Sequence, residues 1–166
     1  AFSNGTHFPE SDNNRSDAEL SRLAPPVFLT IHLNLVEGKA LSPLHKVASL
    51  TNKDSIFRPS FGKLLAISYI PVLRGHFLRQ IRTEFRHQIR RCKPYFDDPT
   101  FAQKIRLDSH VHFHMIPVVF DAMIQAAKLE NLHPSYIRIP KEPVLLYLKH
   151  LHQLEHVRPI NFLKVL

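Results

Sequence analysis

The sequence predicts an α/β protein whose parallel strands alternate with helices, arranged as a (β/α) barrel. Stretches at residues 28–35, 105–115 and 136–139 alternate apolar and polar side chains, which is the period of a strand. Longer stretches between them repeat apolar residues every three or four positions, which is the period of a helix. Strands separated by helices pair in parallel, because a crossover between parallel strands needs a helix.

Length and composition are those of one globular domain. The 166 residues are 44% hydrophobic and 22% charged, so we expect a single domain over residues 1–166 with one core. No apolar run reaches the length of a membrane span. The one cysteine, Cys92, excludes an internal disulfide and favours a reducing, cytoplasmic location. Neither an initiator Met nor a signal-peptide pattern stands at Ala1, so we expect the sequence to continue upstream.

The net charge of +8 raises the question of an anionic partner. Basic side chains concentrate between residues 63 and 93, where Glu84 is the one acid. A basic module that binds nucleic acid or an anionic membrane would use such a stretch. A solvated helix face explains the same charges, and we favour it. There is thus no strong case for nucleic acid or membrane as partners, and a homodimer stays open as an alternative.

The first part of the chain predicts one strand followed by irregular structure. Residues 1–26 are polar and predict a loop with a short helix near 17–23. The strand at 28–35 places leucine and isoleucine on one side and polar residues on the other. A Glu-Gly turn closes it, and residues 41–59 show no period.

The middle of the chain predicts one long amphipathic helix over residues 62–93. Its apolar stripe repeats every four residues, at Phe77, Ile81, Phe85 and Ile89. Pro71 is expected to break or kink the segment near its start. Pro94 is expected to end it, because the residue before a proline disfavours the helical conformation.

The last part of the chain continues the alternation of strands and helices. A strand is predicted at 105–115, a helix at 117–132 and a third short strand at 136–139. A further helix at 142–156 and a last strand at 160–166 follow. Within the helix at 117–132, the inner stripe consists of Val119, Ala122, Met123 and Ala126.

The strand at 105–115 carries an unusual polar face, made of Arg106, Asp108 and three alternate histidines, His110, His112 and His114. Imidazole is a good ligand for zinc and other divalent metals. Alternate strand residues stand about 6–7 Å apart, so all three cannot bind one ion. One or two can ligate while the others orient substrate or support the ligands. A partly exposed polar strand that happens to be rich in histidine is the alternative.

A closed barrel accommodates this polar face better than an open sheet does. In a barrel, the apolar side of the strand faces the covering helices and the polar side points inward, near the active site at the strand's carboxyl end. An open doubly wound sheet buries both faces of its central strands, so inward histidines and an arginine would be hard to satisfy.

Three segments resemble signature segments of the YdjC-like chitooligosaccharide deacetylases. Residues 108–117, DSHVHFHMIP, are similar to the family's DSHxHxH followed by a proline. Residues 31–42, IHLNLVEGKALS, resemble GxHLNLTEGxPLS, and residues 137–142, IRIPKE, resemble VRxPxE. The three segments stand in the family's order at suitable spacing, and the resemblance covers about residues 4–142.

This resemblance implies a TIM-barrel-like fold, of which this chain would be the middle part, since a full barrel takes about 250 residues. It implies one divalent ion, Mg or Zn, held by His32 and a histidine of the 110–114 segment, most simply His110. It implies hydrolysis of the N-acetyl group of an N-acetylated sugar or oligosaccharide, which releases acetate. His112, His114 and Arg138 are the further catalytic side chains that it implies.

One expected part of the family's pattern has no match in this chain. The family's first strand ends in an Asp pair that supplies a metal ligand and a base, and Asp97-Asp98, followed by Pro99, does not resemble it. Arg138, turned inward on its strand, would need a carboxylate nearby. The alternative is that its side chain reaches the rim and meets solvent. We therefore expect an Asp pair upstream of Ala1, one member on the metal and the other near Arg138. A family member that binds sugars without turning them over is the alternative.

Overall fold

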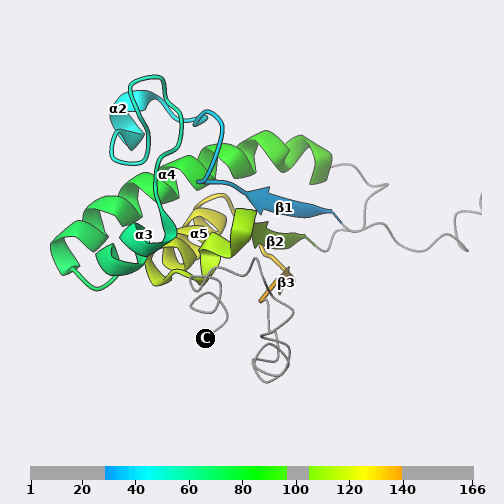
Figure 1. Cartoon of the computed structure of the whole chain (residues 1–166). Helices are drawn as coiled ribbons and strands as arrows, with labels where there is room; N and C mark the ends of the chain where they lie inside the picture. Colours follow the sequence, from blue (N-terminus) through cyan, green and yellow to red (C-terminus); the bar gives the residue numbers. More distant parts are fainter. Residues whose placement is uncertain (1–28, 97–104, 140–166) are drawn as a thin grey trace, which may run out of the picture.

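The computed structural model describes residues 29–96 and 105–139, which form a small parallel sheet and its covering helices (Figure 1). The expected strand and helices outside these ranges, at 17–23, 142–156 and 160–166, lie outside the described residues. In chain order the described elements are β1 (Thr30–Leu33), α2 (Leu44–Val47), α3 (Phe61–Ile67), α4 (Pro71–Phe96), β2 (Arg106–Ser109), the 3-10 helix η1 (His110–Met115), α5 (Pro117–Leu129) and β3 (Tyr136–Ile137).

The three strands lie in the order β1-β2-β3 and both pairings are parallel, as predicted. Thr30 pairs with Arg106, which pairs in turn with Tyr136. Two residues further along β1 and β2, His32 pairs with Asp108. These polar side chains share one face, because strand residues two apart point to the same side of a sheet. The α/β class is confirmed, and closure of the sheet into a barrel stays a prediction.

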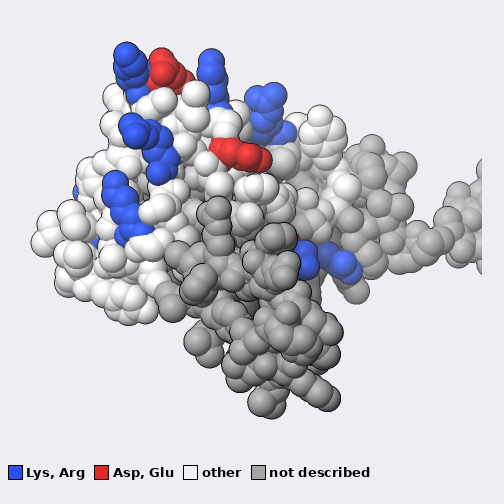
Figure 2. Space-filling model, viewed as in Figure 1, with Lys and Arg blue, Asp and Glu red and all other residues white. Residues whose placement is uncertain are grey.

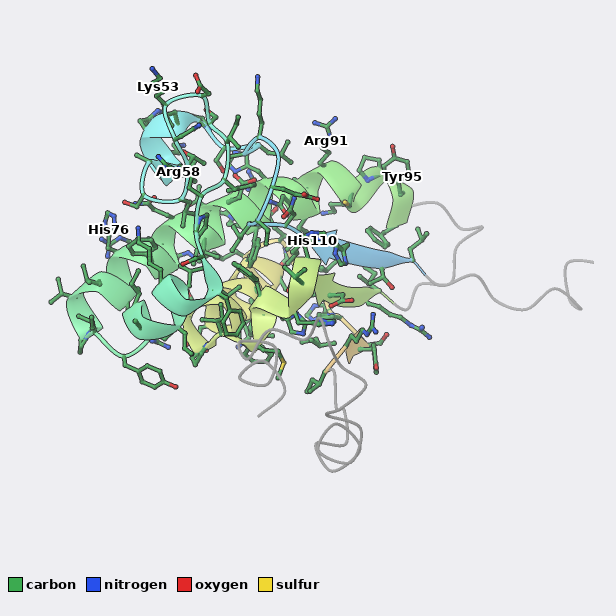
Figure 3. All side chains as sticks on the ribbon, in the orientation of Figure 1. Lys53, Arg58, His76, Arg91, Tyr95 and His110 are labelled. Atoms are coloured by element: carbon green, nitrogen blue, oxygen red, sulfur yellow. The ribbon has the colours of Figure 1, made fainter. Side chains whose placement is uncertain are left out.

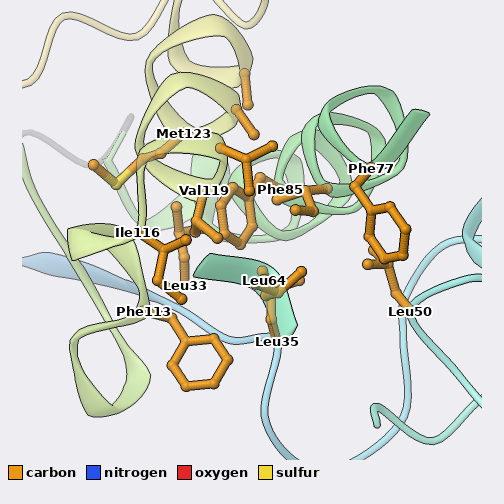
Figure 4. Packing of buried hydrophobic residues seen from close by; sticks show 14 of the residues in the cluster. Leu33, Leu35, Leu50, Leu64, Phe77, Phe85, Phe113, Ile116, Val119 and Met123 are labelled. Atoms are coloured by element: carbon orange, nitrogen blue, oxygen red, sulfur yellow. The ribbon is translucent and has the colours of Figure 1, made fainter. Parts of the chain in front are cut away.

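The other face of the sheet is apolar and is covered by the helices. Ile31 and Leu107 are 2% and 0% exposed there, and α4 packs along α5 and against β1. Figure 4 shows the side chains that fill this space, among them Phe85 of α4 and Val119 and Met123 of α5. The predicted inner stripe of α5 is confirmed, since all four of its residues are buried. The core therefore lies on one side of the sheet and leaves the polar face to form a site.

The long helix predicted over residues 62–93 is two helices. The chain leaves α3 after Ile67 and begins α4 at Pro71, a first-turn position where proline gives up no helical hydrogen bond. The predicted break at Pro71 is confirmed. The predicted end at Pro94 is wrong, because α4 continues to Phe96. Pro94 lacks the N–H that would donate one helical hydrogen bond, and the described part of α4 continues for two residues beyond it.

The segment after β1, predicted to be irregular, is held against α4 by a buried acid. Glu84 of α4 is 0% exposed. Its carboxylate accepts hydrogen bonds from the backbone N–H groups of Leu41, at 3.0 Å, and Ser42, at 2.9 Å. One turn further along α4, Gln88 bonds both the backbone N–H and the carbonyl of Asn34, at 2.9 and 2.8 Å. These bonds fix the 34–42 loop on the helix.

Part of the basic face of α4 packs against an acid of α5 and the acid that directly follows it, instead of facing only solvent. Arg74 pairs with Asp121, and Arg86 and Arg90 donate to the carboxylate of Glu130 at 2.6 and 2.7 Å. Burial alone would raise the pKa of Glu130, but the hydrogen bonds and charges of the two arginines outweigh it and lower that pKa. Figure 2 shows basic side chains spread over one face of the molecule with acids among them. No described helix has the length and apolar character needed to cross a membrane.

Candidate metal and catalytic site

The predicted eleven-residue strand ends after four residues, so the histidines do not share one strand face. β2 stops at Ser109 and the chain turns through η1, where Val111 and His112 have φ angles of 44° and 59°. Two successive left-handed residues reverse the chain direction. The turn buries Phe113, which packs edge to face on Phe61 with ring centroids 5.8 Å apart. The alternation at 110–115 thus reflects a turn at the end of the strand.

Asp108 is the centre around which the turn gathers the polar side chains. Its side chain is only 7% exposed. One carboxylate oxygen, Oδ1, lies 3.9 Å from Nδ1 of His112 and 3.7 Å from Nδ1 of His114. The other, Oδ2, lies 3.9 Å from Nδ1 of His32 and 3.6 Å from Nη1 of Arg138. Four of the five residues predicted for the site therefore surround one acid.

The donor atoms around Asp108 suit a divalent metal ion. Ligand atoms of Asp108, His112 and His114 lie within 4.8 Å of one another. Nδ1 of His112 is buried and has no hydrogen-bond partner, although buried polar atoms are normally paired. An imidazole nitrogen beside a carboxylate is a donor set that zinc and similar ions accept. The residues present therefore fit the ion that the sequence predicted.

The two histidines predicted as ligands, His32 and His110, lie side by side at the rim of this cluster. Nε2 of His32 is 3.4 Å from Nδ1 of His110, and the rings meet edge to face. Nε2 of His110 lies 3.5 Å from Oε1 of Glu37, in the loop that follows β1. Figure 3 labels His110, which lies next to β1. His32 contacts Asp108 directly, and the role of both histidines as ligands stays a prediction.

Arg138 lies differently from the expectation. Its side chain is 60% exposed and already has the Asp108 carboxylate beside it. The argument that a buried guanidinium requires an upstream acid is therefore wrong for this residue, because exposure to water removes the desolvation cost on which it rested. The Asp pair expected upstream of Ala1 stays a prediction.

Among the histidines that the structure describes, His114 is the most buried, with a side chain that is 0% exposed. Burial lowers the pKa of its imidazole, because desolvation disfavours the charged form. A hydrogen bond to the Arg138 carbonyl and the charge of Asp108 oppose this lowering, and the neighbouring His112 and His32 add to it. Burial therefore favours the neutral form of this imidazole.

A pocket of about 460 Å³ opens over the polar face of the sheet. Its wall consists of the row Thr30, Arg106 and Tyr136, the pair His32 and Asp108, and Leu107 and Arg138. The Arg106 guanidinium lies 5.7 Å from the centre of the Tyr136 ring. The pocket therefore joins the candidate metal ligands to an aromatic and a basic side chain on the same face.

Sequence reasoning missed Asp108 as the centre of the site. The residue was placed on the histidine face, but the acid was sought upstream because the family's Asp pair had no match. The signal that could have found it is its position directly before the histidines, at the carboxyl end of a parallel strand, where active sites form. Ser109, which contacts His114, was also missed, whereas Glu37, close after His32 in the sequence, was a candidate for shaping the rim of the site and lies 3.5 Å from His110.

The fold and the site together define an α/β protein with a candidate metal site at the carboxyl ends of parallel strands. The chain belongs to the YdjC-like protein family, whose model matches residues 3–165. It is 29% identical over 133 residues to a carbohydrate deacetylase of Danio rerio, a match that covers 79% of this chain. The chain spans 38% of the length of that relative. No solved structure matches the chain significantly.

Proposed function

We propose that the protein hydrolyses the N-acetyl group of an N-acetylated sugar or oligosaccharide with the help of a divalent metal ion. The family and the carbohydrate deacetylase relative support an amide hydrolase that acts on a carbohydrate. The observation that supports a bound metal ion is that Nδ1 of His112 is buried without a hydrogen-bond partner, 3.9 Å from the Asp108 carboxylate. Burying an unpaired imidazole nitrogen costs free energy, and a metal ion bound between it and the carboxylate would remove that cost.

The residues of the cluster divide the work by position. Asp108 and His112 would hold the ion, with His32 and His110 at the rim able to complete the set. When bound, the ion supplies a Lewis acid that polarises the acetamide carbonyl and lowers the pKa of a water molecule. Arg138 balances the charge of Asp108, and its exposed part can donate hydrogen bonds to a substrate oxygen.

The pocket offers features that suit a sugar. Tyr136 is 53% exposed and lines the pocket, so its ring can lie against the apolar face of a pyranose. Arg106, beside that ring, and Thr30 offer donors to hydroxyl groups from the same row. A small number of polar groups around an apolar surface is the usual composition of a ligand site.

The direct test is acetate release by the purified protein from short N-acetylglucosamine oligomers. We expect release with added Mg²⁺ or Zn²⁺, its loss with a chelator, and its recovery when metal is returned. A metal-loaded protein that binds these oligomers and releases no acetate from a panel of N-acetylated sugars would favour the sugar-binding alternative.

The rival function as a basic module has less support from the structure. Arg74, Arg86 and Arg90, which the sequence offered for contacts with nucleic acid or membrane, are paired with Asp121 of α5 and with Glu130 directly after it. An arginine already paired with a carboxylate gains less from a phosphate, since the first pair must be broken. Binding to duplex DNA that falls steeply with salt would revive this alternative.

A further inference from the structure

Ser109 and His114 form a closed ring of hydrogen bonds between the two ends of the η1 turn. The Ser109 hydroxyl oxygen accepts from the backbone N–H of His114, at 2.8 Å, and lies 2.6 Å from Nδ1 of the same residue. Nε2 of His114 lies 2.6 Å from the carbonyl oxygen of Arg138, after β3. The ring therefore ties the end of β2 to the end of β3 through one fully buried imidazole.

These partners determine which nitrogen of His114 carries the proton. A carbonyl oxygen only accepts hydrogen bonds, so Nε2 must be the donor to Arg138. The Ser109 hydroxyl oxygen already accepts from the His114 backbone N–H, so the hydroxyl hydrogen can be donated to Nδ1. The nitrogen that faces Asp108 is thus already in use, and a metal ion could take it only by displacing Ser109.

His112 presents the opposite case two residues earlier. Its Nδ1 is buried 3.9 Å from Asp108 and has no partner. The backbone that places it there is strained, because Val111 and His112 both lie in the left-handed region, where a β-branched residue is rarely found. A conformation of this kind persists when the surrounding contacts determine it, and such strain gathers at functional sites.

We infer that Ser109 and His114 are positioning residues, whose hydrogen-bond ring holds the strained turn so that His112 faces Asp108. In this inference, which rests on the proposed metal-dependent function, His114 is not itself a ligand. This positioning role replaces the catalytic role that the sequence suggested for His114. Asp108 and His112 remain the proposed ligands of the metal ion.

The first test needs no variant and no metal. Long-range ¹⁵N–¹H correlation spectra of the histidine rings report which nitrogen bears the proton. We expect His114 to show the neutral Nε2–H form with Nδ1 as an acceptor. A proton on Nδ1 of His114 overturns the inference.

The second test uses Co²⁺ as a probe, because its visible spectrum depends on the ligand set. We expect Ser109→Ala and His114→Gln to weaken Co²⁺ binding by about tenfold, the lower range for residues that support ligands. The spectrum at saturation should match that of the wild type in both variants, and His112→Ala should change or abolish it.

A matched pair of controls lies elsewhere on the chain. The Ser42 hydroxyl oxygen lies 3.2 Å from Nδ1 of His87, a part-buried serine–histidine contact on α4, so Ser42→Ala and His87→Gln should leave Co²⁺ affinity unchanged. If His114 is a ligand, Ser109→Ala frees its Nδ1 and affinity stays equal or rises, while His114→Gln alters the saturated spectrum. Either result, or a wild type that binds no Co²⁺, overturns the positioning role. Failure of the proposed deacetylation would instead appear as intact Co²⁺ binding without acetate release.

Discussion

Two acids with little-exposed side chains, Glu130 at the α4–α5 interface and Asp108 at the carboxyl end of β2, have opposite hydrogen-bonding environments. Their side chains are almost equally exposed, at 8% and 7%. Glu130 receives two arginine hydrogen bonds, at 2.6 and 2.7 Å. The described cationic and imidazole neighbours of Asp108 lie 3.6 to 3.9 Å away, beyond hydrogen-bond length. Among the described residues, only the Ser109 backbone N–H, at 2.7 Å, donates a hydrogen bond to this carboxylate.

The difference shows that burial alone does not tell what an acid is for. A buried acid with its hydrogen bonds satisfied stabilises the fold, since its partners replace the water it lost. A buried acid whose neighbours lie beyond hydrogen-bond length has oxygen lone pairs that a bound ion or ligand can still use. The Glu130 pairs thus suit a stabilising role, whereas the surroundings of Asp108 suit the metal site proposed above.

The largest expected effect concerns the activity that depends on Asp108, at the carboxyl end of β2. Asp108→Asn should lower acetate release by about 100-fold or more, because the change removes the charge at the centre of the site. Thermal unfolding should be little affected, since Asp108 makes one bond, from the Ser109 backbone, that an amide oxygen can still accept. Acetate assays and melting curves measure both. A melting temperature that falls together with the activity would break the comparison.

The next effect concerns stability at the interface. Glu130→Gln should lower the free energy of unfolding by about 1–2 kcal/mol, because two charge-assisted hydrogen bonds become neutral ones. Metal binding and acetate release should stay at the wild-type level, since Glu130 belongs to α4–α5 contacts. Urea unfolding followed by circular dichroism provides the value. Equal stability of the variant and the wild type would contradict the role assigned to Glu130.

The stabilisation by Glu130 should also depend on pH with a definite sign. Its pKa is lower in the folded protein than in the unfolded chain, so the folded state binds this proton less readily. The contribution is fully present above about 4.3, the pKa of an unfolded glutamate, and is lost as the pH falls through the folded pKa. The difference in stability between wild type and Glu130→Gln should therefore shrink in acid. A difference that grows below that pH would show the opposite sign.

The smallest effect comes from the second ion pair of the same interface. Asp121 pairs with Arg74, but both side chains are partly exposed, at 43% and 34%. Water screens such a pair, so Asp121→Asn should cost about 0–1 kcal/mol, less than Glu130→Gln. Parallel urea titrations of the two variants give the order. An Asp121 effect larger than that of Glu130 would show that burial is not what separates the pairs.

The sequence predicted the elements well where one period ran through a whole element. The stripe at Val119 and Met123 gave α5, and the alternation around Ile31 and Leu107 gave two parallel strands, because burial on one face leaves a period in the chain. The strands are shorter than predicted, since side chains alternate beyond the last ladder hydrogen bond. Pro94 was wrongly predicted to end its helix, because a proline removes one N–H donor but does not by itself stop α4, which continues to Phe96.

The site was predicted in its residues but not in its geometry. A period of two placed His110, His112 and His114 on one strand face, whereas the left-handed Val111 turns the chain between them. No local preference favours this conformation for valine, so only tertiary contacts could reveal it. The centring of the cluster on Asp108 likewise depends on how three strands align, which is a property of the sheet.

Glu84 gives the site a place in the order of folding. The acid orders backbone groups that precede it by 42 and 43 positions, at Ser42 and Leu41. Closing a loop of this length costs entropy before the two bonds reward it, so we expect the 34–42 segment to become ordered after the middle of α4 has formed. We expect Glu37, which that segment brings within 3.5 Å of His110, to reach this histidine equally late.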